Sequence, residues 1–162
     1  MKALRLSRLI PLLLATACGG SGEENGYPVI EGLDTSRAGV VSFVKERRYQ
    51  GWLAEPAVRD SEGPHGKVRV FFNDVAVRSL RADKETHSRG TILVKELYSP
   101  DGERLIGHAL DVKVENGKGQ DTWLFFEGSL PTYDDAFYGR GEPTCYGCHE
   151  VGKDYVTTAL PQ

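Results

Sequence analysis

The sequence predicts an α+β fold, in which one antiparallel β-sheet carries a few short helices. The first observation is a set of four segments rich in β-branched and aromatic residues: 67–73, 90–99, 103–115 and 121–128. The second is the glycine-containing turns between the later segments, which favour antiparallel neighbours. The third is that helical spacing of apolar residues is confined to two short segments. A sheet with few helices of this kind is typical of the α+β class.

Turns set the order of the predicted strands. The turn PDG at 100–102 separates the second segment from the third, so these two should form a hairpin. The turn NGKG at 116–119 then leads into the fourth segment, DTWLFFEG. Together with KVRVFFN at 67–73, the segments predict a meander of antiparallel strands.

Two helices are expected outside this meander. The segment 35–49 has apolar residues at helical spacing, and Asp34 or Thr35 is the expected N-cap. The segment 74–84 places its apolar residues on one side, with Asp74 as the expected cap.

The first residues have the layout of a secretory signal peptide. A positive start, MKALRLSR, is followed by an apolar run and by small residues that end at Cys18. The run is too short to cross a bilayer, which takes about 20 apolar residues. ATAC resembles a bacterial lipobox, which implies that residues 1–17 are a lipoprotein signal peptide and that Cys18 is lipidated. The alternative is an ordinary signal peptide with a chance cysteine.

Residues 18–30 are rich in glycine and are predicted to be a flexible lipidated tether ahead of one domain at 31–162. Gly19 stands where an aspartate would favour the inner membrane, so we expect an outer-membrane lipoprotein of the bacterial cell envelope that faces the periplasm. Loss of residues 1–17 would remove three basic and no acidic residues, which changes the net charge from −3 to −6. This balance argues against nucleic acid as a partner.

The motif TCYGCHE near the C-terminus carries the remaining two cysteines. A Cys-x-x-Cys-His run in an exported protein indicates c-type haem attachment, with thioethers at Cys145 and Cys148. His149 follows directly, so the same turn can bring its imidazole to the haem iron as an axial ligand. We therefore expect one covalent haem c, and a helical turn over residues 145–151 that Thr144 can cap.

Three other interpretations of the motif compete with haem attachment, and each fits the sequence less well. A thioredoxin-type dithiol would lie early in a domain, after a strand of a βαβ unit. A zinc site needs four ligands, and the chain has no second cysteine pair. A disulfide across two residues is strained.

The sequence does not determine which residue, if any, occupies the second axial position of the iron. The single methionine is Met1, which would leave with the signal peptide, so a methionine ligand is excluded. His65 in a turn-like segment, His87 in a polar segment expected to be a solvated loop, and His108 in the middle of a strand remain as candidates. The favoured expectation is a five-coordinate iron with an open face that admits small molecules.

Several segments together resemble the cytochrome P-460 family and its relative cytochrome c-prime-beta. The resemblance rests on HGKVRVFFNDVAVRSL, GTILVKELYSPDGERLIGHALDVKV, DTWLFFEG and CYGCHEVGKDYV, in that order over residues 65–157. It implies a sheet-rich domain, usually a homodimer, with one five-coordinate haem. In cytochrome P-460 the haem oxidises hydroxylamine and is also bound to a lysine. Cytochrome c-prime-beta lacks that bond and binds nitric oxide.

Lys95 in GTILVKE is the candidate for this cross-linking, catalytic lysine. Alternation along the strand puts Lys95 on the same face as Leu93 and Leu97, which suits a buried or pocket-facing amine. The alternative is a lysine at a strand edge that reaches water. Alternation also allows only one of two side-chain pairs to line a pocket, since Trp123 and Phe125 share one face and Leu124 and Phe126 the other.

The sequence therefore predicts a membrane-anchored mono-haem cytochrome that binds or oxidises hydroxylamine or nitric oxide and passes electrons to a redox partner protein. Whether it is an enzyme stays open. The alternatives are a six-coordinate electron-transfer cytochrome without catalysis and a protein that binds or scavenges nitric oxide without turnover.

Three aromatic residues shortly before the motif are expected to pack against the porphyrin. They are Tyr133, Phe137 and Tyr138.

Overall fold

The computed structural model describes residues 28–162, so the predicted signal peptide, Cys18 and most of the tether lie outside the described residues. The described chain begins with a two-stranded ribbon, in which β1 (Val29–Ile30) pairs with β2 (Leu33–Asp34). Ile30 is buried in the core, so packed structure starts just ahead of residue 31.

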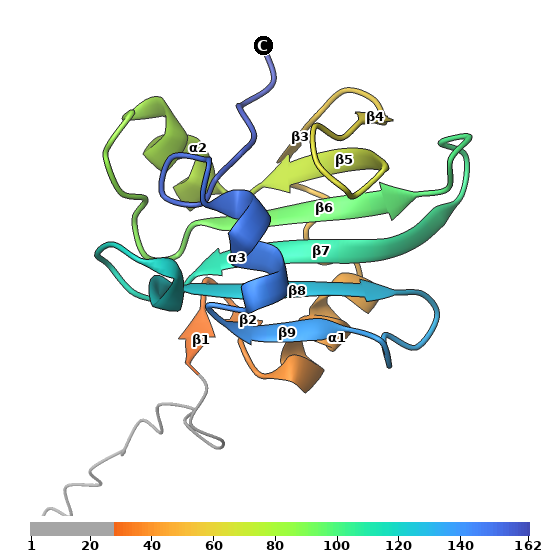
Figure 1. The fold of residues 1–162 in the computed structure, drawn as a ribbon, viewed down its shortest axis with the longest axis horizontal. Helices are drawn as coiled ribbons and strands as arrows, with labels where there is room; N and C mark the ends of the chain where they lie inside the picture. Colours follow the sequence, from red (N-terminus) through yellow and green to blue (C-terminus); the bar gives the residue numbers. More distant parts are fainter. Residues whose placement is uncertain (1–27) are drawn as a thin grey trace, which may run out of the picture.

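An antiparallel sheet of seven strands forms the centre of the domain (Figure 1). Its strands are β3 (Leu53–Ala54), β4 (Arg59–Asp60), β5 (Lys67–Phe72), β6 (Ile92–Tyr98), β7 (Leu105–Lys113), β8 (Trp123–Ser129) and β9 (Phe137–Arg140). Their order is β3-β5-β6-β7-β8-β9, and β4 also pairs with β5. All four predicted strands and both predicted hairpin turns are present, so the α+β class with an antiparallel sheet is confirmed.

Three short α-helices accompany the sheet in residues 28–162: α1 (Arg37–Lys45), α2 (Asp74–Arg81) and α3 (Pro143–His149). A 3-10 turn at Gln120–Thr122 leads into β8. None of these helices is long and apolar enough to span a bilayer.

The predicted helix caps are each displaced by a residue or two. Ser36, not Asp34 or Thr35, caps α1, because its hydroxyl accepts a hydrogen bond from the Gly39 amide.

The same displacement occurs at the other two helices. Asn73, not Asp74, caps α2 by accepting from the Ala76 amide. Glu142, not Thr144, caps α3, and its carboxylate accepts from the Thr144 amide. At α1 and α2 the cap is the polar residue whose backbone is extended just before the first turn.

The sheet separates two apolar clusters. The larger cluster lies on the face covered by α1 and the β1–β2 ribbon and includes Val94, Leu110 and Phe126. The smaller cluster lies on the opposite face, beneath α2 and α3, and includes Phe72, Leu93 and Phe125. Figure 1 shows α3 crossing in front of the central strands. Alternation along each strand thus divides the core into two, and the predicted haem motif packs against the smaller cluster.

Candidate functional site

The predicted haem motif forms α3, which contacts β8 on the front of the sheet. Pro143 occupies the first turn, where a missing amide proton costs nothing, and Glu142 caps the helix. Cys145 and Cys148 are three residues apart and therefore project from the same side of α3. Both thiols are free.

The two thiols differ in their surroundings. Cys145 packs against the smaller apolar cluster, and burial raises its pKa to about 12, with the Asp111 and Glu127 carboxylates adding to the shift. Cys148 is exposed.

His149, at the end of α3, is buried against the sheet with both ring nitrogens engaged. Its Nδ1 lies 2.9 Å from the backbone oxygen of Tyr155, so Nδ1–H can donate to that carbonyl. This contact leaves Nε2 as the nitrogen with the free lone pair. Nε2 in turn lies 3.4 Å from the Nζ of Lys95. The Phe125 ring meets the imidazole edge-on, with ring centroids 5.6 Å apart.

Lys95 lies on the central strand β6 and is only 6% exposed, so the alternative of an edge lysine that reaches water is wrong. Its ammonium lies 3.8 Å from the Asp111 carboxylate on the neighbouring strand β7. The same carboxylate lies 3.7 Å from Nδ1 of His149. A cation, an anion and an imidazole therefore converge on one face of the sheet.

A cavity of about 880 Å³ opens beside this group, and Lys95, Cys148 and His149 all line it. Its walls come from the sheet, from the loop that joins β3 to β5, and from the end of the chain at 157–162. Apolar side chains such as Val68, Val70 and Leu160 contribute much of this wall. The volume falls within the range of about 300–1,000 Å³ that is usual for ligand and cofactor pockets.

The three candidates for a second axial ligand lie in different places. His65 lines the cavity, and its ring centroid is 6.2 Å from that of His149. Its Nδ1 lies 3.1 Å from the Glu127 carboxylate, as an ion-pair contact without hydrogen-bond alignment.

His87 and His108 do not face the cavity. The prediction that His87 lies in a solvated loop is wrong, because its side chain is only 3% exposed. Its Nδ1 forms a hydrogen bond with the Ser79 hydroxyl, and its ring contacts Trp123. His108 points to the opposite face of the sheet, where Tyr49 and Tyr133 bind its two ring nitrogens.

The strand alternation at β8 is as predicted. Trp123 and Phe125 belong to the smaller cluster beside α3, whereas Leu124 and Phe126 belong to the larger core. The expectation that Tyr133 packs near the motif is wrong, because this ring is buried in the larger core against His108.

Sequence reasoning missed the groups that surround His149. Asp111 could have been found, because alternation along 103–115 puts it on the same face as Lys113, and the hairpin register brings that face beside Lys95. The carbonyl of Tyr155 had no such signal. Its approach depends on how the chain after α3 turns back.

These residues fit a c-type haem. The chain offers two thiols on one side of a helix, an imidazole that lines the cavity with its Nδ1 on a carbonyl, and an apolar wall of sufficient size. The carbonyl on Nδ1 is the kind of outer contact that fixes the tautomer and orientation of an iron-bound histidine. Within residues 28–162, no group of three or more histidine, cysteine or carboxylate side chains is arranged to hold a metal ion.

The class that fold and site define is an α+β domain in which a lysine of the antiparallel sheet and a histidine and a free thiol of helix α3 line one cavity. Compared with models of protein families, with curated proteins and with solved structures, the chain finds no match in any of the three.

Proposed function

We propose that this chain is a mono-haem c-type cytochrome of the cytochrome P-460 type. Its haem would be held by Cys145 and Cys148, with His149 on the iron. We propose further that it binds or oxidises small nitrogen compounds such as hydroxylamine or nitric oxide and passes electrons to a redox partner protein. A lipid on Cys18 would anchor it in the bacterial cell envelope.

The observation that carries this proposal is the state of His149. The histidine of the motif is buried and lines a cavity that Cys148 also lines, and its Nδ1 is tied to the Tyr155 carbonyl. A histidine that only filled space would need neither a carbonyl that fixes Nδ1 nor a place on the wall of a cavity of this size. An axial ligand needs both features.

The residues have distinct roles in this proposal. Each thiol would add across a vinyl group, so that sulfur bonds to one carbon and the thiol hydrogen goes to the other. When bound, the haem supplies a redox-active iron at which small molecules coordinate. Lys95 lies on the cavity wall near His149 and is the residue available for a further bond to the macrocycle. Val68 and Val70 would keep that side of the pocket dry.

A second candidate is a six-coordinate electron carrier, and one observation favours it. His65 lines the same cavity, and its ring lies close to His149. If the chain closed slightly around a haem, His65 could supply the second axial nitrogen and leave no open position.

Absorption spectra decide between the two. The exported protein would be purified from a host that matures c-type cytochromes, and spectra recorded in the ferric and ferrous states. The proposal predicts high-spin haem in both states and uptake of nitric oxide by the ferrous form. Low-spin spectra in both states, converted to high-spin by His65→Ala, would contradict the open site and support the electron carrier.

A further inference from the structure

The segment that follows α3 makes a tight turn in an unfavourable backbone conformation. Asp154 and Tyr155 both have positive φ, at 45° and 68°, although neither is glycine. Gly152 lies so close to the Val156 backbone that an added Cβ would come within 2.3 Å of its oxygen. Two adjacent residues of this kind persist only where surrounding contacts hold them.

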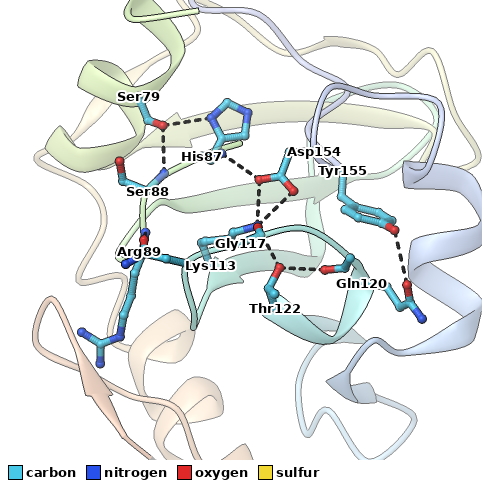
Figure 2. A network of polar contacts seen from close by, with 12 residues as sticks. Ser79, His87, Ser88, Arg89, Lys113, Gly117, Gln120, Thr122, Asp154 and Tyr155 are labelled. Carbon is cyan, nitrogen blue, oxygen red and sulfur yellow. Dashed lines mark hydrogen bonds and ion pairs between the residues drawn. The ribbon is translucent and has the colours of Figure 1, made fainter. Parts of the chain in front are cut away.

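The contacts that hold this turn converge on the Asp154 side chain (Figure 2). Its carboxylate is 3% exposed and lies 2.7 Å and 3.0 Å from the Nζ of Lys113. The backbone amide of His87 donates to the same carboxylate at 2.7 Å. A buried carboxylate with one ion pair and one amide donor is fixed in position, because any displacement would leave a charge without a partner.

Lys113 is equally constrained from the other side. Its side chain is fully buried at the end of β7, and Nζ also donates to the Thr122 hydroxyl at 2.8 Å and the Gly117 carbonyl at 2.9 Å. Its ammonium also lies over the Trp123 ring, 5.0 Å from the centroid. Lys113 thus ties the turn after α3 to the sheet.

The residue after Asp154 is the one that contacts the motif histidine. The carbonyl of Tyr155 accepts from Nδ1 of His149 at 2.9 Å. A continuous line of contacts therefore runs from Lys113 on the sheet, through Asp154, to the carbonyl that sets which nitrogen of His149 keeps its lone pair.

We propose that Lys113 and Asp154 are positioning residues for the axial histidine. Their buried ion pair holds the turn at 154–155 in its left-handed conformation, and this keeps the Tyr155 carbonyl on Nδ1 of His149. The pair thereby sets the orientation and donor strength of the imidazole without touching the haem. This inference rests on the proposed function, because it needs an iron on Nε2.

The test uses the haem-loaded protein and the iron–histidine stretching band of its ferrous state in resonance Raman spectra. Asp154→Asn keeps the size of the side chain but weakens the contact with Lys113. We expect the band to move to lower frequency and to broaden, because the hydrogen bond on Nδ1 becomes weaker and less uniform. Asp83→Asn is the matched control, since Asp83 forms an exposed ion pair with Lys153 of the same segment and should leave the band unchanged.

A second readout follows the turn itself and does not depend on iron. The Gly152 amide donates to the His149 carbonyl, and the Val156 amide to the Lys153 carbonyl. We expect hydrogen exchange of these two amides to accelerate ~10-fold or more in Asp154→Asn, since a charge-assisted contact that holds the turn is lost. Wild-type protein that carries no haem would contradict the proposed function, while the exchange rates would still decide whether Asp154 holds the turn.

Lys113→Met separates positioning from simple loss of stability. Alone it leaves the Asp154 carboxylate buried without a cation, and it is expected to destabilise the fold. The double variant Lys113→Met/Asp154→Asn has no unpaired charge and should recover stability, yet its Raman band should stay shifted. A double variant with the wild-type band and wild-type exchange rates at Gly152 and Val156 would overturn the proposal.

Discussion

Lys95 carries the most specific chemical prediction among the single residues. It is buried, lines the cavity and approaches Nε2 of His149 to 3.4 Å. We expect the peptide that contains Lys95 to stay attached to the haem after proteolysis of the wild-type protein, and to be released in Lys95→Ala. Mass spectrometry of the digest measures this. Lys67→Ala, on the neighbouring strand but outside the cavity lining, is the control. Release of the Lys95 peptide from wild-type protein would rule out the cross-link.

His108 is held as a neutral imidazole on the other face of the sheet. Tyr49 donates to Glu96 and can accept from Nε2 of His108, while the Tyr133 hydroxyl can donate to Nδ1. This arrangement satisfies one neutral tautomer. Burial lowers the pKa of His108 to about 4. The imidazole therefore stays uncharged in the folded protein where it would protonate in the unfolded chain.

That shift predicts how stability depends on pH. Between about pH 6.5 and pH 4 the unfolded state binds more protons at His108 than the folded state, so stability falls as the pH falls through this window. The loss attributable to this residue is about 3 kcal/mol. Urea unfolding at several pH values gives the free energy of unfolding as a function of pH. Its slope against pH between about pH 4 and 6.5 should be shallower for His108→Gln than for wild type. Equal slopes would show that His108 titrates normally in the folded protein.

Single residues also show where prediction from the sequence stops. Lys95 was singled out by the resemblance of its motif, and its face of the strand was predicted correctly because alternation depends only on the local sequence. His87 was placed in solvent because its neighbours are polar, whereas its contacts with Ser79 on α2, with Trp123 and with Asp154 bury it. When segments distant in the chain bury a residue, the sequence around that residue carries no pattern that predicts the burial.

Among the elements, α2 depends on Asn73 more than its position as a cap suggests. The Asn73 side-chain oxygen accepts from the Ala76 amide and from the Ile92 amide at the start of β6. Its amide group donates to the Gly90 carbonyl. One buried side chain therefore caps the helix and joins it to the central hairpin.

Replacing the two caps should separate these roles. Ser36→Ala at α1 removes a cap and an exposed contact with the Asp34 carboxylate, and we expect it to lower the free energy of unfolding by about 1 kcal/mol. Asn73→Ala also leaves buried backbone groups without partners and should cost about 3 kcal/mol. Chemical denaturation of both variants measures the difference. Equal losses would mean that the link from α2 to β6 contributes nothing.

The sequence predicted elements better than it predicted their ends. The four long strands and their two turns follow from residue types that act locally, namely β-branched runs and glycine turns. The short strands β3, β4 and β9 were missed, because each is only two to four residues long and forms by pairing with a longer neighbour. Such strands depend on the sheet and not on their own composition.

At the scale of the whole molecule, one face of the sheet packs the larger core and the other face carries the proposed site. The larger cluster packs against α1 on one face, and the cavity opens on the other. We expect Cys145→Ser/Cys148→Ser to keep the far-ultraviolet circular dichroism of a folded sheet, because the larger core is untouched. Phe126→Ala, in that core, should cost about 3–5 kcal/mol and serves as the contrast. An unfolded double-serine variant would mean that the haem is needed to hold the sheet together.

The intact mass of the exported protein, produced in a host that matures c-type cytochromes, tests the central claim most directly. The account predicts a polypeptide that carries the added mass of one haem after denaturation, and in which neither Cys145 nor Cys148 reacts with an alkylating agent. A wild-type protein whose residues 28–162 carry no added mass, and whose two thiols both react with an alkylating agent, would contradict the account.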